Sequence, residues 1–317
     1  MPITRRPPLL VAAGIGIGLA LCAALALAET GTAAGAIPWW VWPIALFIVC
    51  CFLGVVAVPA GVGGGVLFVP IVSGFFPFHL DFVRAAGLLV ALASALAAGP
   101  QLLRAGYADL RLALPLALIA SASAILGALI GLALPVAIVQ VALGLTILCI
   151  VALMWSAKKS EFPEVTKPDA LGAALRMTGV FHDASHGRNI EWRVHRTPLG
   201  LVLFFGIGML AGLFGLGAGW ANVPTLNLVM GVPLKVSAGT SGFILSIVDT
   251  SAAWVYINKG ALIAMIAAPS VIGMMLGATL GAKLLLVARA STIRALVIGL
   301  LLLAGTRALL KGLGIWM

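Results

Sequence analysis

The sequence predicts an all-α integral membrane protein with two inverted-topology repeats. Each repeat is a glycine-broken helix hairpin followed by three transmembrane helices, and an extra helix lies at the N-terminus. Three observations carry this prediction. Hydrophobic residues make up 62% of the 317 residues and charged residues only 9%, whereas soluble domains carry about a quarter charged residues. Apolar runs of about 20 residues, long enough to cross a bilayer, recur along the chain. One kind of glycine-rich segment occurs twice.

The N-terminal segment, residues 1–38, is predicted to form a transmembrane helix. An apolar run over residues 8–28 follows Arg5 and Arg6 and ends in Ala-Leu-Ala, which resembles a signal-peptide cleavage site. Because the run is long for a signal peptide, we expect an uncleaved helix, with a cleaved leader as the alternative. An aromatic belt, typical of a membrane–water interface, follows at Trp39, Trp40 and Trp42.

The first repeat is predicted over residues 39–155. Its broken segment runs over residues 42–59, is interrupted by glycines and resumes as an apolar run over residues 66–78. The interrupting glycines are Gly61, Gly63, Gly64 and Gly65. Three uninterrupted apolar runs follow and are predicted to cross the membrane, over residues 82–103, 110–134 and 136–155.

Residues 156–197 form the only long polar stretch, and we expect them to be a cytoplasmic loop. The sequence on either side of Gly187 predicts a small β-hairpin with this glycine in its turn. The loop carries three histidines, but we expect a solvated hairpin face there and no metal site.

The second repeat is predicted over residues 198–317 and follows the same plan. Its broken segment runs over residues 199–216 and resumes over residues 220–230 after a second glycine cluster, Gly215, Gly217 and Gly219. Three further apolar runs are predicted to cross the membrane, over residues 236–258, 261–287 and 293–310.

The distribution of basic residues sets the expected orientation. If the loop of residues 156–197 is cytoplasmic, counting spans in both directions leaves only four of the 19 Lys and Arg residues at the outer face: Arg84, Lys259, Arg307 and Lys311. The N-terminus is then cytoplasmic and the C-terminus outside. The first broken segment enters and leaves from outside and the second from inside. The two halves therefore face opposite ways, as in many secondary transporters.

The glycine clusters are predicted to line a substrate site. A break in a membrane helix exposes backbone polar groups, so it persists only inside protein or beside a water-filled cavity. A short helix that starts at mid-depth presents N–H groups and partial positive charge, which suit an anion. The alternative is that the glycines only allow tight helix packing.

Polar residues in the second repeat extend this predicted site. We expect hydrogen bonds to the anion from Asn222, Thr240, Ser241 and Ser246. The first repeat offers only Ser94 and Gln101 at comparable places, so we expect an asymmetric site. For each Ser or Thr, the alternative is a hydrogen bond to a neighbouring helix or to its own backbone.

Two charged residues in the predicted spans are candidates for functional roles. Asp249 is the only acidic residue deep inside a predicted span, where a charge is expensive and usually functional. It is a candidate proton-coupling group, and the alternative is a structural carboxyl that hydrogen-bonds to its neighbours. Arg84 begins its span near the outer face and is a candidate gating residue that attracts anions. The alternative that we favour is an ion pair with Asp81.

Several other functions are disfavoured. A net charge of +10 could suggest nucleic-acid binding, but in a membrane protein basic residues set orientation, and we expect no nucleic-acid partner. The Gly-Thr-Ser-Gly stretch at residues 239–242 resembles a serine-protease motif, yet no histidine lies in a later span to act as base. We expect no enzyme activity, no cofactor and no metal.

These motifs resemble the TauE/SafE family of sulfite exporters. The resemblance rests on GVGGGVLFVP at residues 61–70, GLGAGWANVP at residues 215–224 and AGTS at residues 238–241. It covers the chain from Trp42 to Leu310. Where the second repeat reads AGTS, the first reads AGLL at residues 86–89, which lacks a hydroxyl, and Ala218 replaces a motif glycine.

Membership implies an inner-membrane permease that exports sulfite or carries organosulfonates. We therefore predict a multi-pass transporter that moves a small anion outward by alternating access between the two repeats. The expected partners are the anion and the lipid bilayer, with proton coupling and oligomer formation left open. One alternative is import of another anion, such as sulfate or a carboxylate. Another is an assembly or sensor protein that acts through its cytoplasmic loop.

Overall fold

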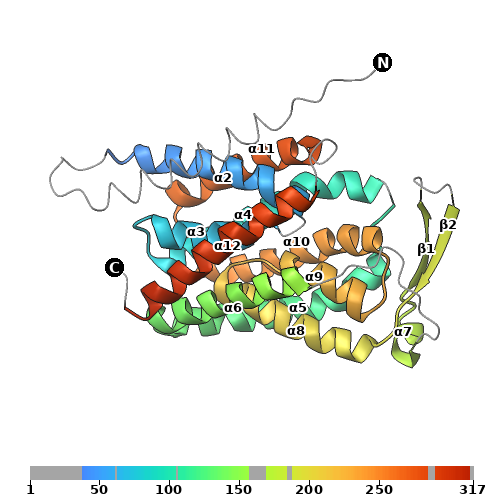
Figure 1. The fold of residues 1–317 in the computed structure, drawn as a ribbon. Helices are drawn as coiled ribbons and strands as arrows, with labels where there is room; N and C mark the ends of the chain where they lie inside the picture. Colours follow the sequence, from blue (N-terminus) through green and yellow to red (C-terminus); the bar gives the residue numbers. More distant parts are fainter. Residues whose placement is uncertain are drawn as a thin grey trace, which may run out of the picture.

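The computed structural model describes residues 38–60, 63–104, 106–156, 169–183, 188–284 and 290–314. The predicted N-terminal helix and Gly61 lie outside these residues, as does the hairpin turn at Gly187. The described chain is almost entirely helical, which confirms the predicted all-α fold (Figure 1).

The first half contains five helices that follow the predicted runs within a few residues. The broken segment forms α2 (Val41–Ala60) and the shorter α3 (Gly64–Phe75). The three long helices are α4 (Leu80–Arg104), α5 (Leu110–Ala133) and α6 (Val136–Ser156).

The second half repeats this order. The broken segment forms α8 (Thr197–Phe214), then the short α9 (Gly219–Pro224), which continues directly into the π-helical turn η1 (Thr225–Val229). Three long helices follow: α10 (Leu234–Asn258), α11 (Ala264–Leu284) and α12 (Ala290–Gly312).

The predicted hairpin is present in the polar linker. Strands β1 (Thr178–Asp183) and β2 (Arg188–Arg193) pair antiparallel and project beyond one end of the helical bundle (Figure 1). The short helix α7 (Ala170–Ala174), which the sequence analysis did not predict, precedes them. The linker is anchored at its base, because Asp169 accepts hydrogen bonds from the backbone N–H and the hydroxyl of Thr197 at 3.0 and 2.8 Å. Trp192 is buried in the apolar cluster that α5, α8 and α10 form.

Among the described residues, six helices are long and apolar enough to cross a membrane. They are α4, α5, α6, α8, α10 and α11, and α2 and α3 are shorter apolar helices. Many of their large apolar side chains are exposed, such as Leu118 at 68% and Val202 at 67%. Lipid contact explains this exposure, because a soluble protein would bury such a surface.

Small residues pack α2 tightly against α11. Cβ atoms added at Gly273, Gly277 and Gly281 of α11 would overlap the backbone of α2 at Phe47, Cys51 and Val55. The residue numbers increase together along the two helices, so the pair is parallel. This spacing of small residues every four positions is the familiar means of close helix approach in membranes.

The corresponding pair in the other half is α5 and α8. Gly208 of α8 lies against Ala120 of α5, and Gly212 lies against Ala124, so this pair is also parallel. By contrast, α6 and α12 run antiparallel, since Gly144 lies against Leu309 and Gly312 against Val141.

The helices α4 and α10 cross at the centre of the bundle in opposite directions. Arg84, near the start of α4, lies over the ring of Tyr256, near the end of α10. Thr240, near the start of α10, contacts Asp109 in the loop that follows α4.

The helix pairs are preserved when each helix of the first half is exchanged with its counterpart in the second half. If α2, α4, α5 and α6 are matched with α8, α10, α11 and α12, the α2–α11 pair becomes α8–α5, and the α4–α10 and α6–α12 pairs map onto themselves. The matched helices α4 and α10 run in opposite directions, which an inverted repeat requires. The pattern supports the inverted relation of the repeats, which stays a prediction.

Two buried apolar clusters make up the core. One is built mainly from α2, α3, α6 and α12, and the other from α5, α8 and α10. Trp220, Leu89 and Leu262 pack against both clusters. The second glycine break, which Trp220 immediately follows, therefore lies where the two clusters meet.

Candidate functional site

The first glycine break lies between α2 and α3. Gly63 has φ +82° and precedes the first turn of α3, a conformation that favours glycine. The backbone N–H of Gly64 donates a hydrogen bond of 3.2 Å to the hydroxyl of Ser94 on α4. The predicted anion site at the start of α3 therefore has one of its N–H groups already occupied.

The second break lies between α8 and α9. Gly215 and Gly217 have φ +69° and +72°, so the chain reverses at two left-handed positions. The backbone N–H groups of Ala221 and Asn222 both reach the carbonyl of Ala218, which closes the first turn of α9. The π-helical turn that follows is a deviation often found at functional sites.

The two breaks meet in space. A Cβ atom added at Gly63 would lie 3.8 Å from the Cα atom of Gly219, and one added at Gly65 would lie 2.5 Å from the carbonyl oxygen of Leu216. The latter distance is too short for any side chain. Glycine at position 65 is therefore required by the close approach of the two backbones, and the glycine clusters of the two halves form one region.

Two fully buried side chains belong to the second half of this region. Asn222 on α9 and Asp249 on α10 are both 0% exposed. Neither side chain has a hydrogen-bond partner among the described residues. Asp249 faces the second break, because a Cβ atom added at Gly217 would lie 3.0 Å from its Oδ2. Buried polar groups without partners are rare and call for a specific explanation.

The hydroxyl groups predicted for the site are distributed more widely. Thr240 accepts a hydrogen bond of 3.2 Å from the backbone N–H of Asp109 and lies nine residues before Asp249, about 13 Å along the helix axis. Ser246 donates to the carbonyl of Phe243 at 2.7 Å, and Ser241 is buried. The structure thus gives Thr240 and Ser246 partners within the protein, which was the alternative for each.

Two residues of this region were not predicted from the sequence to contribute to the site. Ser94 was noted only as a polar residue, whereas it joins α4 to the start of α3 through Gly64. The indole N–H of Trp220 is buried without a partner among the described residues. Its place directly after the second glycine cluster was a signal in the sequence.

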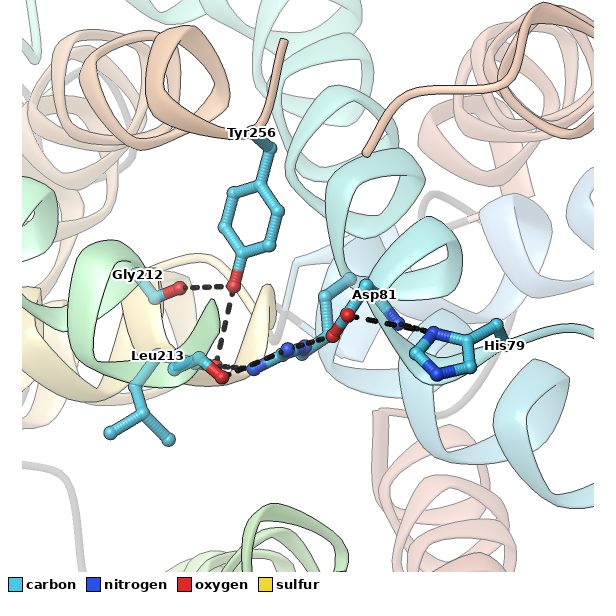
Figure 2. A network of polar contacts seen from close by, with 7 residues as sticks. His79, Asp81, Gly212, Leu213 and Tyr256 are labelled. Atoms are coloured by element: carbon cyan, nitrogen blue, oxygen red, sulfur yellow. Dashed lines mark hydrogen bonds and ion pairs between the residues drawn. The ribbon is translucent and has the colours of Figure 1, made fainter. Parts of the chain in front are cut away.

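Arg84 joins a polar network that includes Asp81, Leu213 and Tyr256, and Figure 2 shows this network from close by. The Arg84 side chain is 1% exposed and forms the predicted ion pair with Asp81. It also donates hydrogen bonds to the carbonyl oxygens of Leu213 at 2.8 Å and Gly131 at 3.1 Å. These carbonyls belong to the last turns of α8 and α5, where the helix dipole favours a cation. Tyr256 donates to the neighbouring carbonyl of Gly212 at 3.0 Å.

The described residues contain no group of three or more His, Cys, Asp or Glu side chains arranged to hold a metal ion. Within this part of the chain, the chemistry of the region depends on backbone groups, one amide, one carboxyl and one indole N–H. Such a set can bind and release a small polar solute, and it lacks the paired groups that nucleophilic catalysis uses.

Comparison with known proteins shows which family this chain is similar to. The family model described as "Sulfite exporter TauE/SafE" matches residues 46–308. One curated relative is the probable membrane transporter protein YunE of Bacillus subtilis (strain 168), which is 29% identical over 119 residues. That alignment covers 38% of this chain and 44% of the relative, so it spans less than half of either protein.

No solved structure matches the chain. The family match covers most of the chain, including both glycine breaks and the helices that cross at the centre. This multi-pass membrane protein therefore belongs to the TauE/SafE family of sulfite exporters.

Proposed function

We propose that this protein exports a small anion, sulfite or an organosulfonate, across the inner membrane by alternating access. The proposal rests on the family, whose model is named for sulfite export. It also rests on the meeting of the two glycine breaks beside the buried, unpartnered side chain of Asp249, with the buried and unpartnered Asn222 three residues after Gly219. That meeting is the observation that carries the proposal.

The anion would lie between the two breaks. The proposed donors are the backbone N–H groups of Gly63, Gly65 and Gly219 and the side-chain amide of Asn222, since the N–H of Gly64 already donates to Ser94. Ser241 lies on α10, eight residues before Asp249. Thr240 and Ser246 support the site through their contacts with Asp109 and Phe243. A site without a fixed cation binds an anion weakly enough to release it, which transport requires.

The proposed orientation puts the N-terminus and the linker of residues 156–197 in the cytoplasm and the C-terminus outside. The distribution of Lys and Arg supports this choice of the cytoplasmic face, and the relative helix directions fit the order of the spans. The parallel pairs α2–α11 and α5–α8 and the antiparallel pairs α4–α10 and α6–α12 are those that the span count requires. The Arg84 network then lies at the outer face, where it would act as a gate that holds α4 against the ends of α5 and α8.

The test is anion flux through purified protein in liposomes. Gly63→Val and Gly217→Val place side chains at left-handed positions in the two breaks, and in the second case against Asp249. Both variants are expected to lose sulfite and sulfonate efflux while remaining folded. Gly206→Val on α8 is the matched control, because nothing lies within 4 Å of its added Cβ.

Efflux that survives in both variants would show that the glycines serve only helix packing. Flux of sulfate or acetate alone, with none of sulfite or sulfonate, would replace the substrate class. If folded wild-type protein carried none of these anions, transport of them would be refuted. Deletion of residues 170–193 would then test the alternative role of the linker in assembly or sensing.

A further inference from the structure

We propose that Asp249 is the binding site for a coupling proton, which the protein takes up together with the anion. This inference rests on the proposed transport function and assigns the coupling ion of the same site. It explains why a carboxyl stands beside a region that otherwise suits an anion.

Asp249 occupies a buried position beside the second glycine break. It lies on α10 in the middle of the bundle, is 0% exposed and faces the second glycine break. Both carboxyl oxygens lack a hydrogen-bond partner among the described residues. An ionised carboxylate without a partner costs several kcal/mol to bury, so the site requires a bound positive charge whenever water is excluded.

In the described part of the chain, no charged side chain of the neighbouring elements is placed to supply that charge. The elements packed against α10 are α4, α5, α8, α9 and η1. Of these, α8, α9 and η1 carry no charged residue, and α5 carries only Arg111, at its N-terminal end. On α4, Asp81 and Arg84 pair with each other, and Arg104 lies at the opposite end of the helix. On α10 itself, Tyr256 donates to Gly212, while Lys235 lies at the start of the helix.

A proton fits the site better than a metal cation does. Ions such as Ca²⁺ need six or more oxygen ligands, and smaller hard cations keep most of their hydration shell. Asp249 belongs to no metal-ligating cluster in the described part of the chain. A single carboxyl in a dry position, by contrast, can hold a proton without any further ligand.

The charges of the anion and of the Asp249 carboxylate determine whether the anion and the proton favour or oppose each other's binding. An anion bound between the glycine breaks would lie close to Asp249, because a Cβ atom added at Gly217 would lie 3.0 Å from this carboxyl and one added at Gly63 would lie 3.8 Å from the Cα atom of Gly219. Two negative charges repel each other strongly in a low-dielectric site. Bound anion therefore favours the neutral carboxyl, and by reciprocity a bound proton favours the anion. Proton and anion bind together and cross the membrane together.

The test measures proton uptake on anion binding to the full-length protein. Methanesulfonate is the probe, because it remains a monoanion across the pH range and adds no titration of its own. Calorimetric titration in two buffers of different ionisation enthalpy counts the protons taken up. We expect wild-type affinity to fall about tenfold for each pH unit in the range where the carboxyl must gain its proton.

Asp249→Asn keeps the shape of the side chain and removes the titrating group. This variant is expected to bind methanesulfonate with no proton uptake and with an affinity independent of pH. Glu191→Gln, on the exposed face of β2, is the matched control and should titrate like the wild type. In infrared spectra, a carbonyl band of a protonated carboxyl should appear in the wild type and be absent from Asp249→Asn.

The outcomes separate the two proposals. Anion binding without proton uptake in the wild type, or proton uptake that persists in Asp249→Asn, would refute the coupling site and leave transport standing. An infrared spectrum that Asp249→Asn does not change would also refute it. Absence of binding for methanesulfonate and sulfite alike, in folded protein, would refute the proposed substrate class and the inference that rests on it.

Discussion

Replacing Arg84 with Met should destabilise the protein more than any other single change in the network of Figure 2. Met keeps most of the apolar stem but loses the guanidinium. The carbonyl oxygens of Leu213 and Gly131 then lose their bonds of 2.8 and 3.1 Å to Arg84. Three helices, α4, α5 and α8, are no longer joined at this point.

The expected loss of unfolding free energy follows from the two hydrogen bonds that Arg84 donates. Hydrogen bonds to a charged group contribute about 1.5–3 kcal/mol each, and two of them give about 3–6 kcal/mol. The ion pair adds little, because the Asp81 side chain is 24% exposed and solvent screens it. Water that enters the vacated space offsets part of the loss. We expect the free energy of unfolding to fall by about 3–5 kcal/mol.

The assay is unfolding of the detergent-solubilised protein, followed by circular dichroism. Tyr256→Phe is the matched control, because it removes a neutral hydroxyl, which donates to Gly212 at 3.0 Å and lies 3.4 Å from the carbonyl of Leu213, and leaves the ring in place. Its expected cost is about 1 kcal/mol. If Arg84→Met proved no more destabilising than Tyr256→Phe, the role of the guanidinium as a link between helix ends would be refuted.

Two further changes test the breaks and the helix interfaces. Ser94→Ala leaves the buried N–H of Gly64 without its partner and should lower the free energy of unfolding by about 1–3 kcal/mol. The control is Ser121→Ala, which removes a hydroxyl that has no partner among the described residues. This control should be nearly neutral in the same unfolding assay. Gly277→Leu drives a side chain into the backbone of Cys51 and should separate α2 from α11, which would appear as a loss of folded protein in size-exclusion chromatography. Gly299→Leu on α12 meets open space and should fold normally; equal yields for the two variants would contradict the packing described for α11.

Most of the helical architecture could be predicted from the sequence. Long apolar runs separated by Pro, Gly or charged residues leave little choice inside a membrane, because an unsatisfied backbone cannot persist in lipid. The breaks after Ala60 and Phe214 were visible for the same reason. The hairpin was visible from a different signal, the turn residue Gly187 within a polar stretch. The helix α7 was missed because five residues are too few to show a period.

The partners of individual polar residues could not be predicted. Arg84 reaches Leu213, which is 129 residues away, and Ser94 reaches Gly64 on another helix. Helical periodicity assigns residues to a face of their own helix and says nothing of which helix covers that face. Thr240 is an example, since its hydroxyl accepts a hydrogen bond from the backbone N–H of Asp109, a partner that the sequence did not indicate; its predicted contact with substrate stays a prediction. Two polar features were nevertheless indicated by the sequence: the burial of Asp249 and the ion pair of Arg84 with Asp81 three residues before it.

The glycine-mediated pairing of α2 with α11 and of α5 with α8 determines which parts of the molecule can move as units. Each pair joins a helix from one half of the chain to a helix from the other. Close-packed backbones do not slide past one another without losing their dispersion contacts. We therefore expect each pair to move as one unit that contains a helix from each half. In the proposed alternating-access cycle, these two units would tilt around the crossed helices α4 and α10.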